Sequence, residues 1–426
     1  MTELPTLSLK RLAAAVAGGA AAFRSRTRLQ PAGGPGDKVF PPTYATGDRT
    51  LRYAIEHRRI DGAEVATVLL DSVASQANRM EEALQRGWEE ERLRFPLLAV
   101  DFSGCEGIAD LTRLSALEVP HRIADALLRD SVTEDGTLFR DTELGHAYTG
   151  ATAGDATAVY KACPTALVFG VWDSTGPRGG SGAKFARALV SEIVAIDAVT
   201  GAKVSSRIDP AGIQAGVRVY HREDDPDDWT VFEDEAQKKG NRPVLFRRKS
   251  SEGKAGRPSA VNHSNVTPSI DTFAGGITFD YALQTSVLSL PALRRLRFVR
   301  DVSGEPLRPE TRQRAEGAAR TALAALALAA LAWHRRDGFD LRSRCALVPD
   351  GPHVLELVPA DGGDTESFRL TADQAAELLD AAHEAASACG FGWEREPLRL
   401  RPAEKLADLI RKSRELAAAG AGDEEA

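Results

Sequence analysis

Hydrophobic positions recur along the chain at two spacings. Apolar residues three or four positions apart predict amphipathic or buried helices over residues 62–84, 318–333 and 371–388. Short apolar runs predict strands over 97–102, 165–172 and 277–290. The segments 342–348 and 354–358 flank a Pro-Asp-Gly-Pro turn and predict a hairpin. Helices alternate with several of these strands, so the pattern favours an α+β body.

A stricter alternation occurs near the N-terminus, over residues 23–29. In a strand, Arg24, Arg26 and Arg28 share one face, and the four residues between and beside them share the other. Three arginines on one face suit a bound anion, but a solvated or acid-paired sheet face fits the same pattern. The loop that follows, 30–44, carries Lys38 between stiff proline and permissive glycine residues. Its two aromatic side chains can stack on a base, but packing of the loop against the protein itself is the commoner use of such residues.

The predicted helix 62–84 has an unusual polar face. Ser72, Ser75, Gln76 and Arg79 recur at helical spacing beside Asn78, whereas a solvated helix face usually carries glutamate and lysine. Hydroxyl, amide and guanidinium groups suit phosphate oxygens and ribose hydroxyls without reading bases. Burial of this face against another subunit is the competing interpretation.

A glycine-rich loop follows the predicted strand 165–172 and precedes residues 185–193, whose spacing predicts a helix. Backbone N–H groups of such a loop attract anionic oxygens, and Arg178 and Lys184 add full charges. The spacing departs from a nucleotide-binding P-loop because Phe185 stands where a hydroxyl residue is required. The sequence therefore predicts a contact to a phosphodiester backbone, with a solvated surface loop as the alternative.

Residues 221–262 lack apolar periodicity and predict a projecting insertion. Their first half is acidic and their second half is basic, with Arg247, Arg248 and Lys249 at the centre and His263 just beyond. We expect the acidic half to face a neighbouring subunit and the basic half to face nucleic acid. The formal net charge of −7 over 426 residues argues against a non-specific nucleic-acid coat but leaves a local basic groove open.

The remaining composition restricts chemistry and location. The four cysteines form no C-x-x-C pair, and the eight histidines form no H-x-H or H-E-x-x-H motif, so neither a metal site nor a disulfide framework is predicted. No G-x-S-x-G motif occurs, and we expect no catalytic set and no cofactor. The apolar run 322–333 is shorter than the roughly 20 residues a bilayer requires, so we expect a buried helix, no membrane and a cytoplasmic protein.

Four segments resemble one known family. The sequences SQANR at 75–79, GVWDS at 170–174, SRIDPAGI at 206–213 and GGITFDYALQ at 275–284 resemble the RAMP backbone subunit of type I-U, also called I-G, CRISPR effector complexes. The resemblance covers roughly residues 20–400.

This resemblance implies an RRM-like (ferredoxin-like) palm with an inserted thumb and additional helices. The implied organisation is palm over 20–220, thumb over 221–262, palm completion over 263–400, and a C-terminal helix with a frayed tail over 401–426. Family members polymerise along CRISPR RNA and bind its sugar–phosphate chain, and in type I systems they do not cleave it. The implied partners are CRISPR RNA, the target DNA strand paired to it, copies of the subunit, and other Cascade subunits.

Two functions of other classes stay open at this point. Related subunits of type III complexes cleave target RNA with a loop aspartate, for which Asp37 or an acid of the insertion is the candidate here. A small-molecule phosphate or nucleotide enzyme could use the loop from Gly176 to Lys184.

Overall fold

The computed structural model describes residues 4–48, 50–176, 182–247, 255–394 and 396–418. The chain divides into two compact units. The first comprises Met1–Asp37, Ile55–Asp197 and Phe279–Ala426, and the second comprises Lys38–Ala54 and Ala198–Thr278.

An antiparallel sheet is the centre of the first unit. Its strand order is β19-β20-β1-β18-β9-β3-β2, with β21 paired to β1 and β22 paired to β21. The strands are β1 (Ala20–Pro31), β2 (Ile55–Ile60), β3 (Ala63–Asp71), β9 (Leu189–Ile196), β18 (Tyr281–Ser289), β19 (Phe339–Asp340), β20 (Ala346–Pro349), β21 (Leu355–Pro359) and β22 (Glu366–Phe368).

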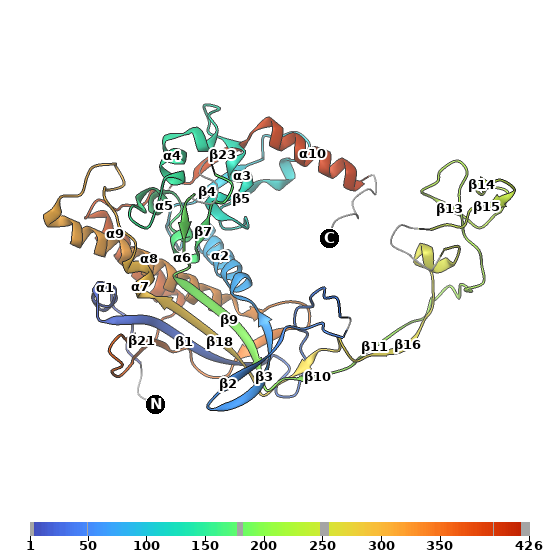
Figure 1. Ribbon diagram of the computed structural model, residues 1–426, viewed down its shortest axis with the longest axis horizontal. Coiled ribbons are helices and arrows are strands. Elements are labelled where there is room, and N and C mark those ends of the chain that lie inside the picture. Colours follow the sequence, from blue (N-terminus) through green and yellow to red (C-terminus); the bar gives the residue numbers. More distant parts are fainter. Residues whose placement is uncertain (1–3, 49, 177–181, 248–254, 395, 419–426) are drawn as a thin grey trace. The chain divides into compact units, whose positions relative to one another are not determined.

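Helices cover one face of this sheet. The helix α2 (Val73–Glu89) packs on β9, and α8 (Pro309–Asp337) packs on α2 and on β18. Figure 1 shows these helices, with α7 (Leu290–Arg294) and α9 (Ala372–Ser387), on one side of β1, β18 and β9. Among the described elements of the first unit, helices therefore cover one face of the sheet and leave the other face uncovered.

Chain order around the sheet follows two β-α-β units. The path runs β1, α2, β9, then β18, α8 and the strands β20 and β21, and it arranges these strands in the order β20/β21-β1-β18-β9. The hairpin of β2 and β3 extends the sheet beyond β9. The chain enters the second unit twice, over Lys38–Ala54 between β1 and β2 and over Ala198–Thr278 between β9 and β18.

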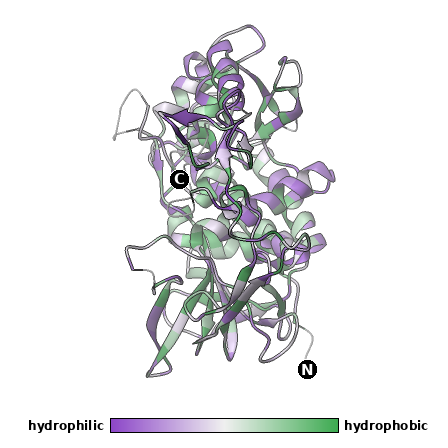
Figure 2. Cartoon of the chain, turned by 90° about the vertical axis from the view of Figure 1, so that its right-hand side faces the viewer, coloured by the Kyte–Doolittle hydropathy of each residue, from purple (hydrophilic) through white to green (hydrophobic). Residues whose placement is uncertain are grey.

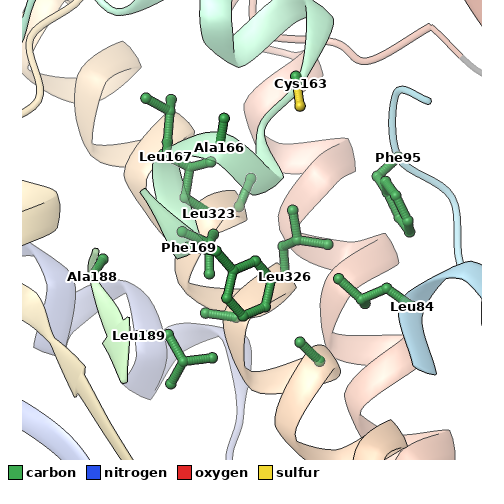
Figure 3. Close-up of a cluster of buried hydrophobic side chains, with 14 of the residues drawn as sticks. Leu84, Phe95, Cys163, Ala166, Leu167, Phe169, Ala188, Leu189, Leu323 and Leu326 are labelled. Carbon is green, nitrogen blue, oxygen red and sulfur yellow. The ribbon is translucent and has the colours of Figure 1, made fainter. Parts of the chain in front are cut away.

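The hydrophobic core lies between the sheet and its helices. Figure 3 shows part of it, where Phe169 and Leu167 meet Leu323 and Leu326 of α8. Among the described helices, α8 is long and apolar enough to cross a membrane, but 83% of its most apolar window is buried inside the protein, which is typical of a core helix. The buried helix predicted at 318–333 is confirmed, as is the helix predicted at 371–388.

A smaller sheet and several short helices complete the first unit. Its strand order is β5-β4-β23-β6, and the strand predicted at 97–102 is confirmed as β4. The elements are α1 (Leu9–Ala17), β4 (Leu98–Asp101), β5 (Arg113–Ser115), α3 (Ala126–Arg129), β6 (Ser131–Val132), α4 (Glu143–Thr149), α5 (Thr157–Ala162), α6 (Thr165–Phe169), β7 (Val171–Trp172), β8 (Lys184–Phe185), β23 (Leu398–Pro402) and α10 (Glu404–Ala418). In Figure 2 the strands and helices carry both green and purple segments, as expected where each element has a buried and an exposed side.

Three predicted elements are wrong. The segment 62–84 is not one helix, because β3 continues to Asp71 and α2 starts only after the N-cap Ser72, whose hydroxyl accepts from the Ser75 N–H. The run 165–172 is helix α6 followed by the two residues of β7, because a segment buried on all sides shows no periodicity that separates helix from strand. The helix predicted at 185–193 is the end of β8 and the first part of β9, so the glycine loop does not lead into a helix N-terminus.

The predicted hairpin is also wrong. The strands β20 and β21 do not pair with each other but lie one after the other along the same edge of β1. Leu29 faces Pro349 at one end of β1, and Phe23 faces Leu357 nearer the other end. The Pro-Asp-Gly-Pro turn therefore joins two strands that share one long partner.

The second unit contains short antiparallel pairs. The pairs are β10 (Val199–Thr200) with β17 (Ile277–Thr278), β11 (Lys203–Arg207) with β16 (Val266–Asp271), β12 (Tyr220–His221) with β13 (Trp229–Thr230), and β14 (Lys238–Lys239) with β15 (Arg242–Pro243). Its buried apolar cluster consists of Val219, Phe246 and Ala260. The predicted insertion 221–262 lies inside this unit, which extends further in both directions and includes Lys38–Ala54.

Candidate nucleic-acid interface

The alternation predicted for residues 23–29 is confirmed in β1. Ser25, Thr27 and Leu29 point into the protein, whereas Arg26 and Arg28 are exposed on the face of the sheet that no helix covers. We call Arg24, Arg26 and Arg28 the β1 arginine row. Successive charges of the row are two strand residues apart, which is about 6.8 Å.

The three arginines of the row differ in their partners. Arg24 Nε donates to Glu356 Oε2 at 2.7 Å, so this charge is neutralised across the strand pair. The Arg28 guanidinium lies 3.8 Å from the centre of the Tyr281 ring, a distance typical of a cation–π contact. Among the described residues, no carboxylate lies within ion-pair distance of Arg26 or Arg28. The acid-paired alternative therefore holds for Arg24, and two cations are left for an outside anion.

The polar strip of α2 is turned toward a buried carboxylate. Asp71, at the end of β3, is fully buried and accepts from Ser75 Oγ at 2.7 Å, Gln76 Nε2 at 2.7 Å and Arg79 Nε at 3.0 Å. Arg342 also lies 3.3 Å from this carboxylate. Asp71 thus holds Ser75, Gln76 and Arg79 from within: Gln76 is fully buried, Ser72, Ser75 and Arg79 are half-buried, and Asn78 is exposed.

Gln76 extends this internal hydrogen-bond network to strands β9 and β18. Its Oε1 accepts from Ser191 Oγ and from Gln284 Nε2, each at 2.9 Å. Gln284 Oε1 in turn accepts from Arg335 at 3.0 Å, and burial lowers the pKa of Arg335 to about 9. These groups fix strands β9 and β18 to the helices and leave Gln76 no route to an outside ligand.

A cleft of about 930 Å³ lies beside the glycine loop, in the first unit. Its walls include Trp172 of β7, Lys184 of β8, Arg187, and His121 and Arg129 from the segment that precedes and forms α3. β7 and β8 pair so that Trp172 stands directly opposite Lys184. The volume is within the range of roughly 300–1,000 Å³ typical of ligand clefts.

Acidic groups near this cleft are neutralised. Asp173 is buried, and both of its carboxylate oxygens accept from the same terminal nitrogen of Arg140, each at 2.9 Å. Glu81 is also buried and accepts two hydrogen bonds from Arg122, at 2.6 and 2.7 Å, while burial raises the pKa of this carboxyl. The cleft therefore presents a positive lining.

The other expected site residues take various positions. Lys38 Nζ donates to the Ala202 carbonyl at 2.7 Å within the second unit. His263 Nδ1 lies 3.7 Å from Asp209 Oδ2, and the Arg247 backbone N–H donates to His221 Nε2. Arg178, Arg248 and Lys249 lie outside the described residues.

Sequence reasoning missed Asp71 and, in the cleft, Arg187 and His121. Asp71 carries no motif, and only the end of β3 explains its position. Trp172 was visible as an aromatic residue directly before the glycine loop, but the helix prediction for 185–193 hid the pairing that aligns it with Lys184. Within the part of the chain that the structure describes, no group of three or more His, Cys, Asp or Glu could hold a metal ion.

One family model matches part of the chain. Residues 23–200 match the family model described as CRISPR-associated protein GSU0053. This match supports a CRISPR-associated protein, and it includes most of β1 together with α2, the cleft and β9. A search of curated proteins found no match to the chain.

Proposed function

We propose that this CRISPR-associated protein is the backbone subunit of a type I-U (I-G) Cascade complex, which binds the sugar–phosphate chain of CRISPR RNA without reading its sequence. The observation that carries the proposal is the pair Arg26 and Arg28 on the uncovered sheet face, with no carboxylate within ion-pair distance among the described residues. A subunit that must accept any guide sequence needs contacts to phosphates and not to base edges. Side chains of fixed positive charge at strand spacing meet that need.

The strand order supports an RRM-like palm. An antiparallel order of fourth, first, third and second strand, with two helices on one face, is the ferredoxin-like arrangement, and β20/β21, β1, β18 and β9 with α2 and α8 follow it. In this interpretation the segment Ala198–Thr278 of the second unit, which contains residues 221–262, is the thumb, inserted between the second and third palm strands. The hairpin of β2 and β3 is an addition to the palm edge.

The proposed partners are CRISPR RNA, the target DNA strand that pairs with it, further copies of the chain and other Cascade subunits. We infer a cytoplasmic location without a membrane partner, which agrees with four free cysteines. The proposed role is binding rather than catalysis. Cleavage of RNA by Asp37 is the competing function.

Co-expression tests this function. The chain is produced with its companion subunits and a CRISPR array, the complex is purified, and copurifying RNA is sequenced. We expect array-derived RNA of uniform length with the wild-type chain and at least a tenfold smaller yield with the double variant Arg26→Gln/Arg28→Gln.

The control is Arg336→Gln, because Arg336 is held by Glu90 at 2.8 Å and is not on the sheet face. Equal RNA yield from the double variant and the control would overturn the role of the row. RNA shortened by metal-dependent cleavage, and restored to full length by Asp37→Asn, would favour the competing function.

A further inference from the structure

The cleft beside β7 and β8 offers a second set of cations without described carboxylate partners. It is lined by an exposed aromatic ring and by cations, and it lies on different elements from the β1 arginine row. We propose that this cleft binds one unpaired nucleotide of the RNA, with its base stacked on Trp172 and its phosphate held by Lys184 and Arg187. The proposal rests on the proposed function, because it assigns a second contact on the same RNA.

Trp172 provides the stacking surface. The residue is 54% exposed, which is high for a tryptophan. Among the described residues of the first unit, no other large aromatic residue is exposed. Its neighbour Val171 is buried, and Val171 pairs with Phe185, so the short ribbon anchors the exposed ring. A fixed, exposed ring stacks on any base, because every base has a π face.

Lys184 supplies a charge beside that surface. Its Nζ lies 4.9 Å from the centre of the Trp172 ring. No described carboxylate lies within ion-pair distance of this amine. The amine lies over one face of the ring, so a base stacks on the other face, and a phosphate that follows this base meets the positive charge of Lys184 beside the ring.

Arg187 supplies a second charge with a fixed direction. Its Nε donates to the Phe169 carbonyl at 3.1 Å, which orients the guanidinium and leaves its two terminal nitrogens without a described partner. Partial burial lowers the pKa of Arg187, because desolvation and the neighbouring Arg122 oppose its charge. A bound phosphate would relieve both effects, and an arginine offers it two parallel donors.

The carboxylates of the cleft do not repel such a ligand. Asp173 is compensated by Arg140, and Arg129 retains its contact to Asp130 at 2.8 Å. The uncompensated lining charges are therefore positive. A phosphodiester bearing a base fits this set better than an apolar molecule or a cation.

Fluorescence anisotropy with labelled single strands tests the cleft. The probes are an oligouridylate of about 12 nucleotides, within the site sizes of single-strand binders, and a strand of equal length without bases, and both are measured against the full chain. Trp172→Ala should weaken binding of the oligouridylate about 5- to 150-fold, which corresponds to roughly 1–3 kcal/mol for one stacked base. Trp172→Phe should restore affinity to within about threefold, and neither variant should change binding of the strand without bases. Lys184→Gln/Arg187→Gln should weaken both strands.

Two comparisons separate this proposal from the proposed function. Arg26→Gln/Arg28→Gln should weaken both strands, whereas Lys412→Gln, in an exposed lysine held by Glu415, should weaken neither. If Trp172→Ala binds oligouridylate as wild type does, the cleft proposal is overturned while the role of the arginine row stands. If Arg26→Gln/Arg28→Gln binds normally and Trp172→Ala does not, the proposed role of the β1 arginine row is overturned while the cleft proposal stands.

A last arm separates a nucleotide in a chain from a free nucleotide. AMP at millimolar concentration should leave the oligouridylate bound. If AMP binds at micromolar concentration through Trp172 and the oligouridylate does not bind, the cleft is a small-nucleotide site and the RNA assignment is overturned.

Discussion

Single buried titratable residues make the stability of this protein depend on pH and on charge, and His334 is the clearest case. Its side chain is 3% exposed, and its Nε2 has no partner among the described residues. Burial, assisted by the cations Arg335, Arg79 and Arg86, lowers its pKa from 6.5 to about 4. Between pH 6.5 and pH 4, His334 is protonated in the unfolded chain but stays neutral in the folded chain. The free energy of unfolding therefore decreases as the pH falls toward 4. Between about pH 7 and pH 5 this histidine should contribute a loss of about 2 kcal/mol in the free energy of unfolding.

Urea titrations at the two pH values measure that loss. The variant His334→Leu removes the titrating group and should show a loss about 2 kcal/mol smaller than the wild type. Carboxylates titrate equally in both proteins, so the difference isolates the histidine. An identical pH dependence in the two proteins would show that His334 titrates normally in the fold.

Asp71 is a second residue whose burial should contribute measurably to the free energy of unfolding. It is fully buried and compensates Arg79 and Arg342. Asp71→Asn keeps the shape but loses the charge, and it should lower the free energy of unfolding by about 3–5 kcal/mol, because two cations lose their counter-ion. The exposed Glu377→Gln should change it by less than about 0.5 kcal/mol. A loss below about 1 kcal/mol in Asp71→Asn would mean that the two arginines do not depend on this carboxylate.

Elements of secondary structure were predictable where one face meets solvent. The alternation of β1 can be recognised in the sequence because Arg26 and Arg28 remain outside while Ser25 and Thr27 are buried. α6 could not be recognised, because all five of its residues are buried and a uniformly apolar run fits helix and strand equally. The polar strip of α2 was located, but its direction was not, since the burial of Gln76 depends on Asp71 in a different element.

Close packing between elements gives a prediction at two glycines. A Cβ on Gly145 of α4 would lie 2.1 Å from the Phe139 carbonyl oxygen and 2.6 Å from the Arg140 Cα, both backbone atoms that cannot turn aside. Gly145→Ala should lower the free energy of unfolding by about 1–3 kcal/mol or more. Gly317 of α8 has open space at its Cβ, so Gly317→Ala should raise it by about 0.5–1 kcal/mol through helix propensity. Chemical denaturation of both variants checks the pair, and equal effects would contradict the close approach of α4 to residues 139–141.

At the scale of the whole molecule, charge distribution matters more than net charge. The formal net charge is −7, yet the uncovered sheet face and the cleft each present cations without described carboxylate partners. This separation could not be predicted along the chain, because it depends on which acid the fold brings to each arginine: Glu356 reaches Arg24 from a strand that is distant in the sequence, and Asp173, also distant in the sequence, reaches Arg140. Only the fold decides which arginines are neutralised and which can meet an anion.

Salt dependence of RNA binding counts the arginines that meet phosphates. For single strands, the logarithm of the binding constant falls with the logarithm of salt concentration by about 0.7 for each phosphate neutralised. Arg26→Gln/Arg28→Gln should therefore reduce the slope by about 1.4, while Arg24→Gln should reduce it little, since Glu356 already holds that charge. Affinities of the full chain for a labelled oligouridylate between roughly 50 and 300 mM salt, a range in which such slopes are resolved, give the measurement. A slope unchanged in the double variant would mean that Arg26 and Arg28 do not neutralise phosphates, even if the affinity falls. If Arg24→Gln reduces the slope as much as the double variant does, Glu356 releases Arg24 when RNA binds.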